Sequence, residues 1–171
     1  MTRAVSVGER EVREALSAVT DPEIPVITIA DLGILRDVEV RDGHVTVTIT
    51  PTYSGCPAME EIGADVRSAL AALGWTDVTV RTVLSPAWTT DWMSEDGRQA
   101  LREYGIAPPG RRPAGPVPVR LGLSRPAAPV LDCPHCGSSA TEELTRFGST
   151  SCTSLWRCRS CREPFAHFKQ H

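Results

Sequence analysis

Six cysteines are the residues of this chain best suited to metal or sulfur chemistry, and four of them form two short motifs. Cys133-Pro134-His135-Cys136 and Cys158-Arg159-Ser160-Cys161 are C-x-x-C pairs, a spacing that lets two thiolates bind one side of a tetrahedral ion. The predicted ligands are Cys133, Cys136, Cys158 and Cys161. Zinc is the favoured ion because such pairs are typical of structural zinc sites, and a rubredoxin-like iron site or an iron-sulfur cluster is the alternative.

The segment that carries both motifs, residues 132–171, has room for strands at 142–146 and 155–157. A segment of this size buries too little apolar surface to fold unaided, so metal binding would supply much of its folding free energy. We therefore predict a C-terminal zinc ribbon with a structural four-cysteine site. Cys152 lies between the motifs without their spacing, and we expect a partly buried free thiol there, with a cluster ligand or an exchangeable thiol as alternatives.

Cys56 stands apart from the other thiols and directly precedes Pro57. Proline favours the first helical position, so Cys56 is expected at or near a helix N-cap, where the helix dipole stabilises a thiolate. A reactive, solvent-reachable thiol is one interpretation, and a buried cysteine that fills space is the other. Asp21 and Glu23 either serve as ordinary capping acids or offer carboxylates to a metal beside Cys56.

Apolar periodicity predicts the elements that position these thiols. Two helical patterns alternate with β-rich runs, and Asp42-Gly43 is a strong hairpin signal. The order α-β-β-α-β indicates a small α+β domain. The expected elements are helices at 6–19, 57–73 and 94–104 and strands at 34–40, 45–49 and 77–84.

The expected organisation is an α+β domain over 1–106, a linker over 107–131 and the ribbon over 132–171. Proline density in the linker is typical of a semi-rigid extended segment. Trp88 and Trp92 fall in a loop after the last strand of the first domain. We expect both indoles to be partly exposed and to contact a partner chain, whereas the alternative is that they close the core.

Charge argues against nucleic acid as the main partner. The formal net charge is -3, so the chain lacks the basic excess that phosphate binding requires. A local positive balance in the ribbon keeps nucleic acid as a minor alternative, and it comes from Arg146, Arg157, Arg159, Arg162 and Lys169. Neither a signal peptide nor a membrane span is recognisable, so we expect a cytoplasmic protein.

Several motifs carry a resemblance to a known family. Asp21-Pro22-Glu23-Ile24-Pro25, Asp31-Leu32-Gly33 and Thr52 to Pro57 resemble the iron-sulfur cluster assembly domain family over roughly residues 8 to 84. The chain as a whole is similar to the PaaD family of the phenylacetate-degradation system. The additional motifs are Pro86 to Met93, Tyr104-Gly105-Ile106, Phe147-Gly148-Ser149-Thr150 and Glu163-Pro164-Phe165.

The resemblance implies association with 1,2-phenylacetyl-CoA epoxidase, a multicomponent oxygenase of phenylacetate catabolism with a di-iron oxygenase subunit and an iron-sulfur reductase. It further implies an accessory maturation role, in which Cys56, assisted by Asp21, transiently holds iron or an iron-sulfur cluster. Either of those two components is a candidate client, and a homodimer is possible. The alternative is a structural or regulatory subunit. Catalysis is not expected here, because the chain lacks an E-x-x-H pair, a dinucleotide glycine fingerprint and ferredoxin cysteine spacing.

Overall fold

The computed structural model describes residues 7–110 and 130–170, so most of the expected linker lies outside the described residues. Contacts divide the chain into two units between Ala100 and Leu101. The first unit contains a three-stranded sheet and the second a four-stranded sheet. Each unit therefore has its own sheet and is described separately.

The first unit has the predicted α-β-β-α-β order. Its elements are α1 (Val7–Leu16), β1 (Leu35–Arg41), β2 (His44–Ile49), α2 (Ala58–Ala72) and β3 (Val78–Thr82). β1 and β2 pair antiparallel across the Asp42-Gly43 turn, where both residues have positive φ, and β3 pairs parallel with β2. Parallel neighbours need a long crossover, and α2 supplies it.

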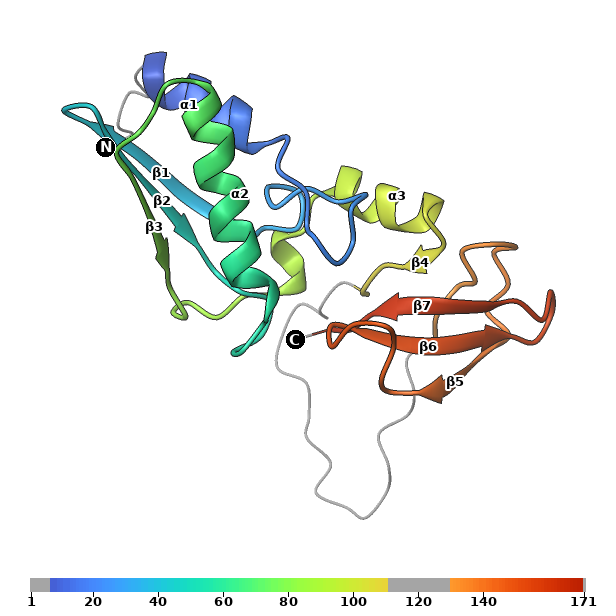
Figure 1. The fold of residues 1–171 in the computed structure, drawn as a ribbon. Helices are drawn as coiled ribbons and strands as arrows, with labels where there is room; N and C mark the ends of the chain where they lie inside the picture. Colours follow the sequence, from blue (N-terminus) through green and yellow to red (C-terminus); the bar gives the residue numbers. More distant parts are fainter. Residues whose placement is uncertain (1–6, 111–129, 171) are drawn as a thin grey trace. The chain divides into compact units, whose positions relative to one another are not determined.

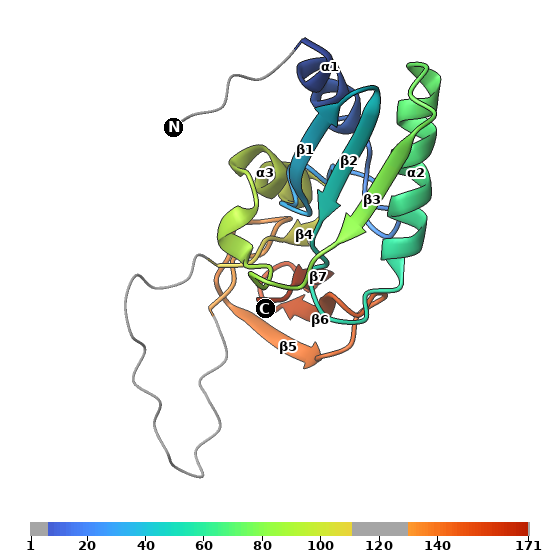
Figure 2. The same ribbon diagram turned by 90° about the vertical axis from the view of Figure 1, so that its left-hand side faces the viewer.

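Both helices lie on one face of the β1-β2-β3 sheet, as Figures 1 and 2 show from two sides. β2 alternates between buried and half-buried residues, the pattern of a strand with one covered face. The apolar core between sheet and helices includes Leu16, Val38, Val45, Val47, Ile49, Ile62, Val66 and Leu70, all essentially inaccessible to solvent. This core makes α2, and the loop before it, a fixed scaffold.

The Asp31-Leu32-Gly33 motif anchors the segment that follows β3. The Ser94 hydroxyl donates to Asp31 Oδ1 over 2.6 Å, and the indole of Trp88 donates to the Leu32 carbonyl over 2.9 Å. Gly33 has φ +78, and a Cβ there would lie 2.7 Å from Trp92 Cβ. The motif therefore has a structural role inside the first unit.

The expectation that both tryptophans are partly exposed is wrong for Trp88. Its side chain is 5% exposed, because its N–H finds the Leu32 carbonyl and its ring can then be buried without an unpaired donor. Trp92, in the short 3-10 helix Thr90–Trp92, is half-buried, and the Arg36 guanidinium carbon lies 3.4 Å from its ring centroid. The predicted third helix follows as α3 (Glu95–Glu103).

The second unit is built from β4 (Ile106–Ala107), β5 (Thr141–Thr145), β6 (Thr153–Cys158) and β7 (Pro164–Phe168), in the sheet order β4-β7-β6-β5. β5, β6 and β7 pair antiparallel, whereas β4 pairs parallel with β7. The expected boundaries need correction, because Ile106 and Ala107 form a strand of the ribbon sheet. The sequence pattern assigns them to the first domain and to the linker.

No helix in residues 7–110 and 130–170 is long and apolar enough to cross a membrane.

Replacing Gly33 with alanine should destabilise the first unit by about 2 to 4 kcal/mol, because the new Cβ collides with Trp92 in a backbone region that favours glycine. Gly43→Ala is the matched control. It has φ +82 but open space around the position, so only the backbone term of about 1 kcal/mol applies. Urea unfolding followed by the helical circular dichroism signal measures both, and equal losses would contradict the steric account.

Candidate metal centre and thiol site

The four predicted ligands converge at one end of the ribbon. Their sulfur atoms all lie within 4.8 Å of one another. The Sγ atoms of Cys133 and Cys161 are 3.7 Å apart, and those of Cys136 and Cys158 are 3.6 Å apart. A tetrahedral ion with metal–sulfur bonds of about 2.3 Å places its ligands about 3.8 Å apart. The donor set therefore fits a tetrahedral thiophilic metal ion.

The two C-x-x-C motifs have equivalent backbone shapes. In each, the residue after the second cysteine has positive φ, +73 at Gly137 and +69 at Arg162. The hydroxyls of Ser138 and Ser160 lie 2.8 Å apart and link the two motifs. This repetition presents two sulfur atoms from each side of the site.

Backbone amides and crowding act on the thiols in opposite directions. The N–H groups of Cys161 and then Ser160 favour the Cys158 thiolate and lower its pKa to about 6. At Cys161 the N–H of Glu163 also favours the thiolate, but burial and the neighbouring thiols outweigh it and raise the pKa to about 12. Four thiols this close cannot all ionise unless a cation compensates their charge.

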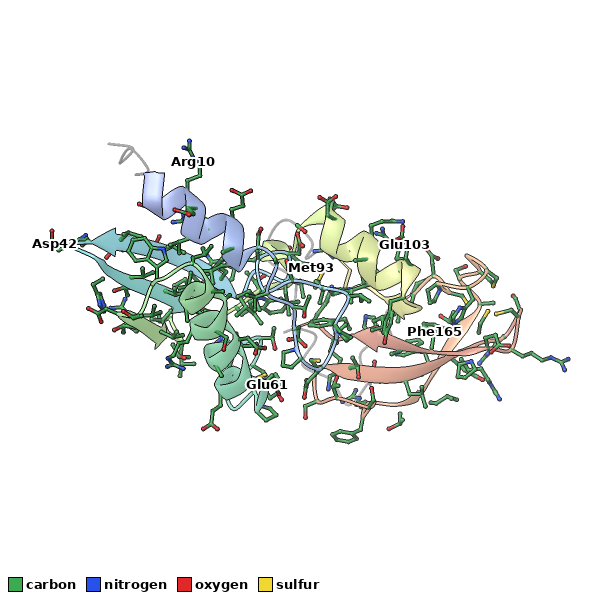
Figure 3. The ribbon with its side chains drawn as sticks, turned by 45° about the horizontal axis from the view of Figure 1, so that its top comes forward. Arg10, Asp42, Glu61, Met93, Glu103 and Phe165 are labelled. Atoms are coloured by element: carbon green, nitrogen blue, oxygen red, sulfur yellow. The ribbon has the colours of Figure 1, made fainter. Side chains whose placement is uncertain are left out.

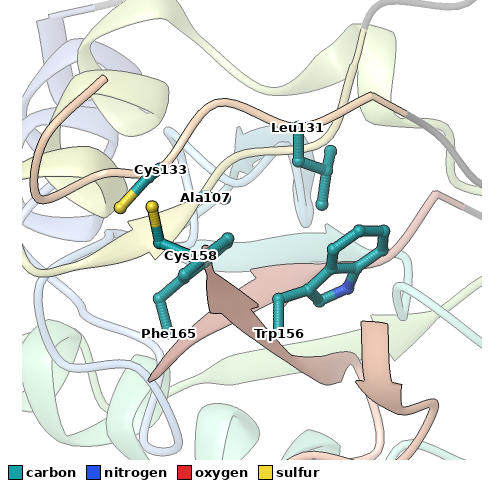
Figure 4. Close-up of a cluster of buried hydrophobic side chains, with 6 residues drawn as sticks. All are labelled: Ala107, Leu131, Cys133, Trp156, Cys158 and Phe165. Atoms are coloured by element: carbon teal, nitrogen blue, oxygen red, sulfur yellow. The ribbon is translucent and has the colours of Figure 1, made fainter. Parts of the chain in front are cut away.

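The metal centre rests on a small apolar core. Cys133 and Cys158 are buried, and their sulfur atoms face each other above the ring of Phe165 (Figure 4). Cys136 is exposed on the solvent side. The remaining members of this core are Ala107, Leu131 and Trp156.

Cys152 is a buried free thiol rather than a member of the four-sulfur cluster. Its sulfur lies 3.0 Å from the Thr150 hydroxyl. The buried His167, which no sequence pattern singled out, lies with its Nδ1 3.3 Å from the Ser154 hydroxyl, and burial followed by the charge of Lys169 lowers its pKa to about 4. A neutral histidine at physiological pH therefore belongs to the ribbon core.

Cys56 lies half-buried in the loop before α2, one residue ahead of the N-cap Pro57. Its pKa is raised, first by burial and then by the charges of Glu23 and Asp21, although the N–H of Ala58 opposes the rise. The expectation of a thiolate favoured by the helix terminus is therefore wrong. Loss of solvent and two nearby carboxylates outweigh the amide and keep the thiol protonated.

Asp21 is also buried and is fixed by the chain that follows it. Its Oδ1 accepts hydrogen bonds from the N–H groups of Glu23 and Ile24 over 2.9 and 2.8 Å. Burial raises its pKa against these bonds, and the charge of Glu61 raises it further. Glu61, which the sequence did not single out, lies in the first turn of α2, and Figure 3 shows it there. Residues from two distant segments thus form an acidic site around Cys56.

Comparison with known proteins identifies both units. The family model described as iron-sulfur cluster assembly protein matches residues 9–82, and that of the PaaD zinc beta ribbon domain matches residues 120–169. An Escherichia coli (strain K12) protein, named for its place among the subunits of 1,2-phenylacetyl-CoA epoxidase, is 45% identical over 173 residues, which cover 99% of each chain. The chain belongs to the PaaD family.

Other relatives match the first unit of this PaaD family member. An Fe-S protein maturation auxiliary factor of Porphyromonas gingivalis is 41% identical over 57% of this chain and 91% of its own. The crystal structure of a domain of unknown function, DUF59, from Bacillus anthracis is 31% identical, with a TM-score of 0.51, over 54% of this chain and 90% of that chain. The predicted combination of an iron-sulfur-assembly fold and a zinc ribbon is confirmed.

Cys158→Ser should unfold the ribbon and release its metal, because comparable small modules derive about 10 kcal/mol of folding free energy from the ion. Cys152→Ser is the control, since that buried thiol lies outside the cluster. Metal content per chain and the amide NMR spectrum report the two effects. Ribbon signals that stay dispersed in metal-free Cys158→Ser protein would contradict this dependence.

Alkylation of Cys56 should have a pH midpoint above that of an ordinary thiol, about 8.5. Glu23→Gln should move the midpoint to lower pH, because it removes a charge that opposes ionisation. Asp42→Asn, in the β1–β2 turn at the other end of the unit (Figure 3), should leave it unchanged. Peptide mass spectrometry after timed iodoacetamide treatment measures the rates. A wild-type midpoint below 8.5 would show that the helix terminus dominates after all.

Proposed function

We propose that this chain is an accessory maturation factor of 1,2-phenylacetyl-CoA epoxidase that holds iron or an iron-sulfur cluster at Cys56 before passing it on. One observation carries the proposal. Cys56 shares its surroundings with Asp21, Glu23 and Glu61, inside the segment that matches the iron-sulfur cluster assembly family. The name of the Porphyromonas gingivalis relative, a maturation auxiliary factor, supports the same assignment.

The acidic surroundings explain how the site would select a cation. Without metal, the carboxylates and burial keep the Cys56 thiol neutral. An arriving iron ion reverses the balance, because its charge favours both the thiolate and the carboxylates. The two bonds to Asp21 Oδ1 orient the carboxylate, so that Oδ2 can act as a second ligand.

A site with so few protein ligands is suited to transfer. A stored iron-sulfur cluster is commonly held by four cysteine thiolates, whereas the thiols described near the start of α2 include Cys56 alone. One thiolate and one carboxylate bind iron weakly and leave coordination positions open. A client protein with more thiolates can then take the metal.

The ribbon is assigned a structural zinc ion. The sulfur–sulfur distances of 3.6 and 3.7 Å support a closed tetrahedral thiolate site, which zinc favours. The buried Cys133 and Cys158 connect the ion to the apolar core. Zinc then maintains the ribbon fold, and the ribbon is available to bind a client.

The similarity over 99% of both chains to a protein named as part of the epoxidase supports a place in that complex. The reductase and the di-iron oxygenase component are the proposed clients, in the cytoplasm. The same observation favours a second candidate function, a structural or regulatory subunit that needs no metal at Cys56. Stoichiometric co-purification with the epoxidase, independent of Cys56, would identify that role.

Cys56→Ser should leave folding nearly unchanged, within about 1 kcal/mol for a half-buried site, while lowering the iron content of epoxidase subunits made in the same cells. Cys152→Ser should leave the iron content at the wild-type level. Iron and sulfide analysis of the purified subunits, with epoxidase activity, tests both variants. Full iron loading and activity with Cys56→Ser would exclude the transfer mechanism.

A further inference from the structure

Three arginines gather around a hollow beside the metal centre. The hollow has a volume of about 390 Å³ and is lined by Arg157, Cys158, Arg159 and Arg162. Arg157 belongs to β6, whereas Arg159 and Arg162 lie within and directly after the second C-x-x-C motif. The metal-bound backbone would therefore hold all three guanidinium groups close together.

Glu142 on β5 organises two of these arginines. Its Oε1 accepts from Arg157 and its Oε2 from Arg159, in each case from both Nε and one terminal nitrogen. Each guanidinium has five N–H donors, so several remain available on each. Glu142 thus holds the arginines in place and lowers the entropy lost when another anion binds.

Arg162 is held in a conformation that its side chain does not favour. Its φ of +69 is in the region typical of glycine, and glycine occupies the equivalent position, Gly137, in the other motif. Among the described residues no partner engages the Arg162 guanidinium, its neighbour Glu163 included. A strained position that carries an unpaired charge indicates a requirement for the side chain itself.

We propose that Arg157, Arg159 and Arg162 form a docking site for an acidic segment of a partner protein. Three positive charges face one internal carboxylate at this hollow, so one or two further carboxylates are needed for balance. Glu142 shows that the guanidinium groups already present carboxylate-binding geometry. The site goes beyond the proposed metal transfer and does not depend on Cys56.

A protein partner fits better than nucleic acid. Polynucleotides need an extended basic surface, whereas the chain has a net charge of -3 and the ribbon carries acids such as Asp132, Glu143 and Glu163 around its arginines. A compact hollow with three guanidinium groups suits a few carboxylates from one short segment. The segment would bind next to the exposed side of the metal centre.

The test uses the metal-loaded full chain and a fluorescent peptide of alternating glutamate and glycine, with a glutamine version and a thymidine oligonucleotide as comparison probes. Fluorescence anisotropy should show binding of the glutamate peptide and little binding of the other two. Arg162→Gly should weaken peptide binding by about tenfold, the effect of losing one close charge pair. Glycine suits the backbone there, so metal content and the NMR spectrum should show a folded ribbon.

Arg146→Gln is the matched control, because it removes one positive charge from the same ribbon outside the hollow. It should change peptide affinity by less than about twofold. Equal weakening by Arg146→Gln and Arg162→Gly would overturn the site in favour of general charge attraction. Binding of the glutamine peptide as tightly as the glutamate one, tighter binding of the oligonucleotide, or no peptide binding would overturn it as well.

Discussion

The convergence of four sulfur atoms is the constraint on which the second unit depends. Two C-x-x-C motifs separated by a hairpin can meet only if β5, β6 and β7 pair in one register. The apolar core below the sulfurs is small, so the ion and the strands stabilise each other. The same convergence places Arg159 and Arg162 around one hollow, which makes the docking surface a by-product of metal-bound geometry.

The first unit follows a different physical logic, because its core is apolar and needs no ion. That core supports a loop in which burial and carboxylates keep Cys56 neutral. A protonated thiol among acids is a poor nucleophile but a good cation trap. One chain thus combines a closed thiolate site that retains its ion with an open one suited to release.

Local patterns in the sequence predict much of this molecule. Periodicity predicts both long helices and the β1–β2 hairpin, and cysteine spacing predicts the metal centre. β4 is missed because two residues carry no periodic signal, and β7 because it follows the second motif directly and begins at Pro164. The pKa of Cys56 is misjudged because it depends on Glu23, whose proximity no sequence spacing encodes.

The link between Asp31 and Ser94 joins residues 63 positions apart, and it has a consequence for the order of folding. Contacts this distant in sequence form late, because closing the loop costs entropy before the contact is made. During synthesis, helices and strands up to β3 can assemble first, while Leu32 and Gly33 wait for Trp88 and Trp92 to emerge. The first unit is therefore completed only once the ribosome has passed the start of α3.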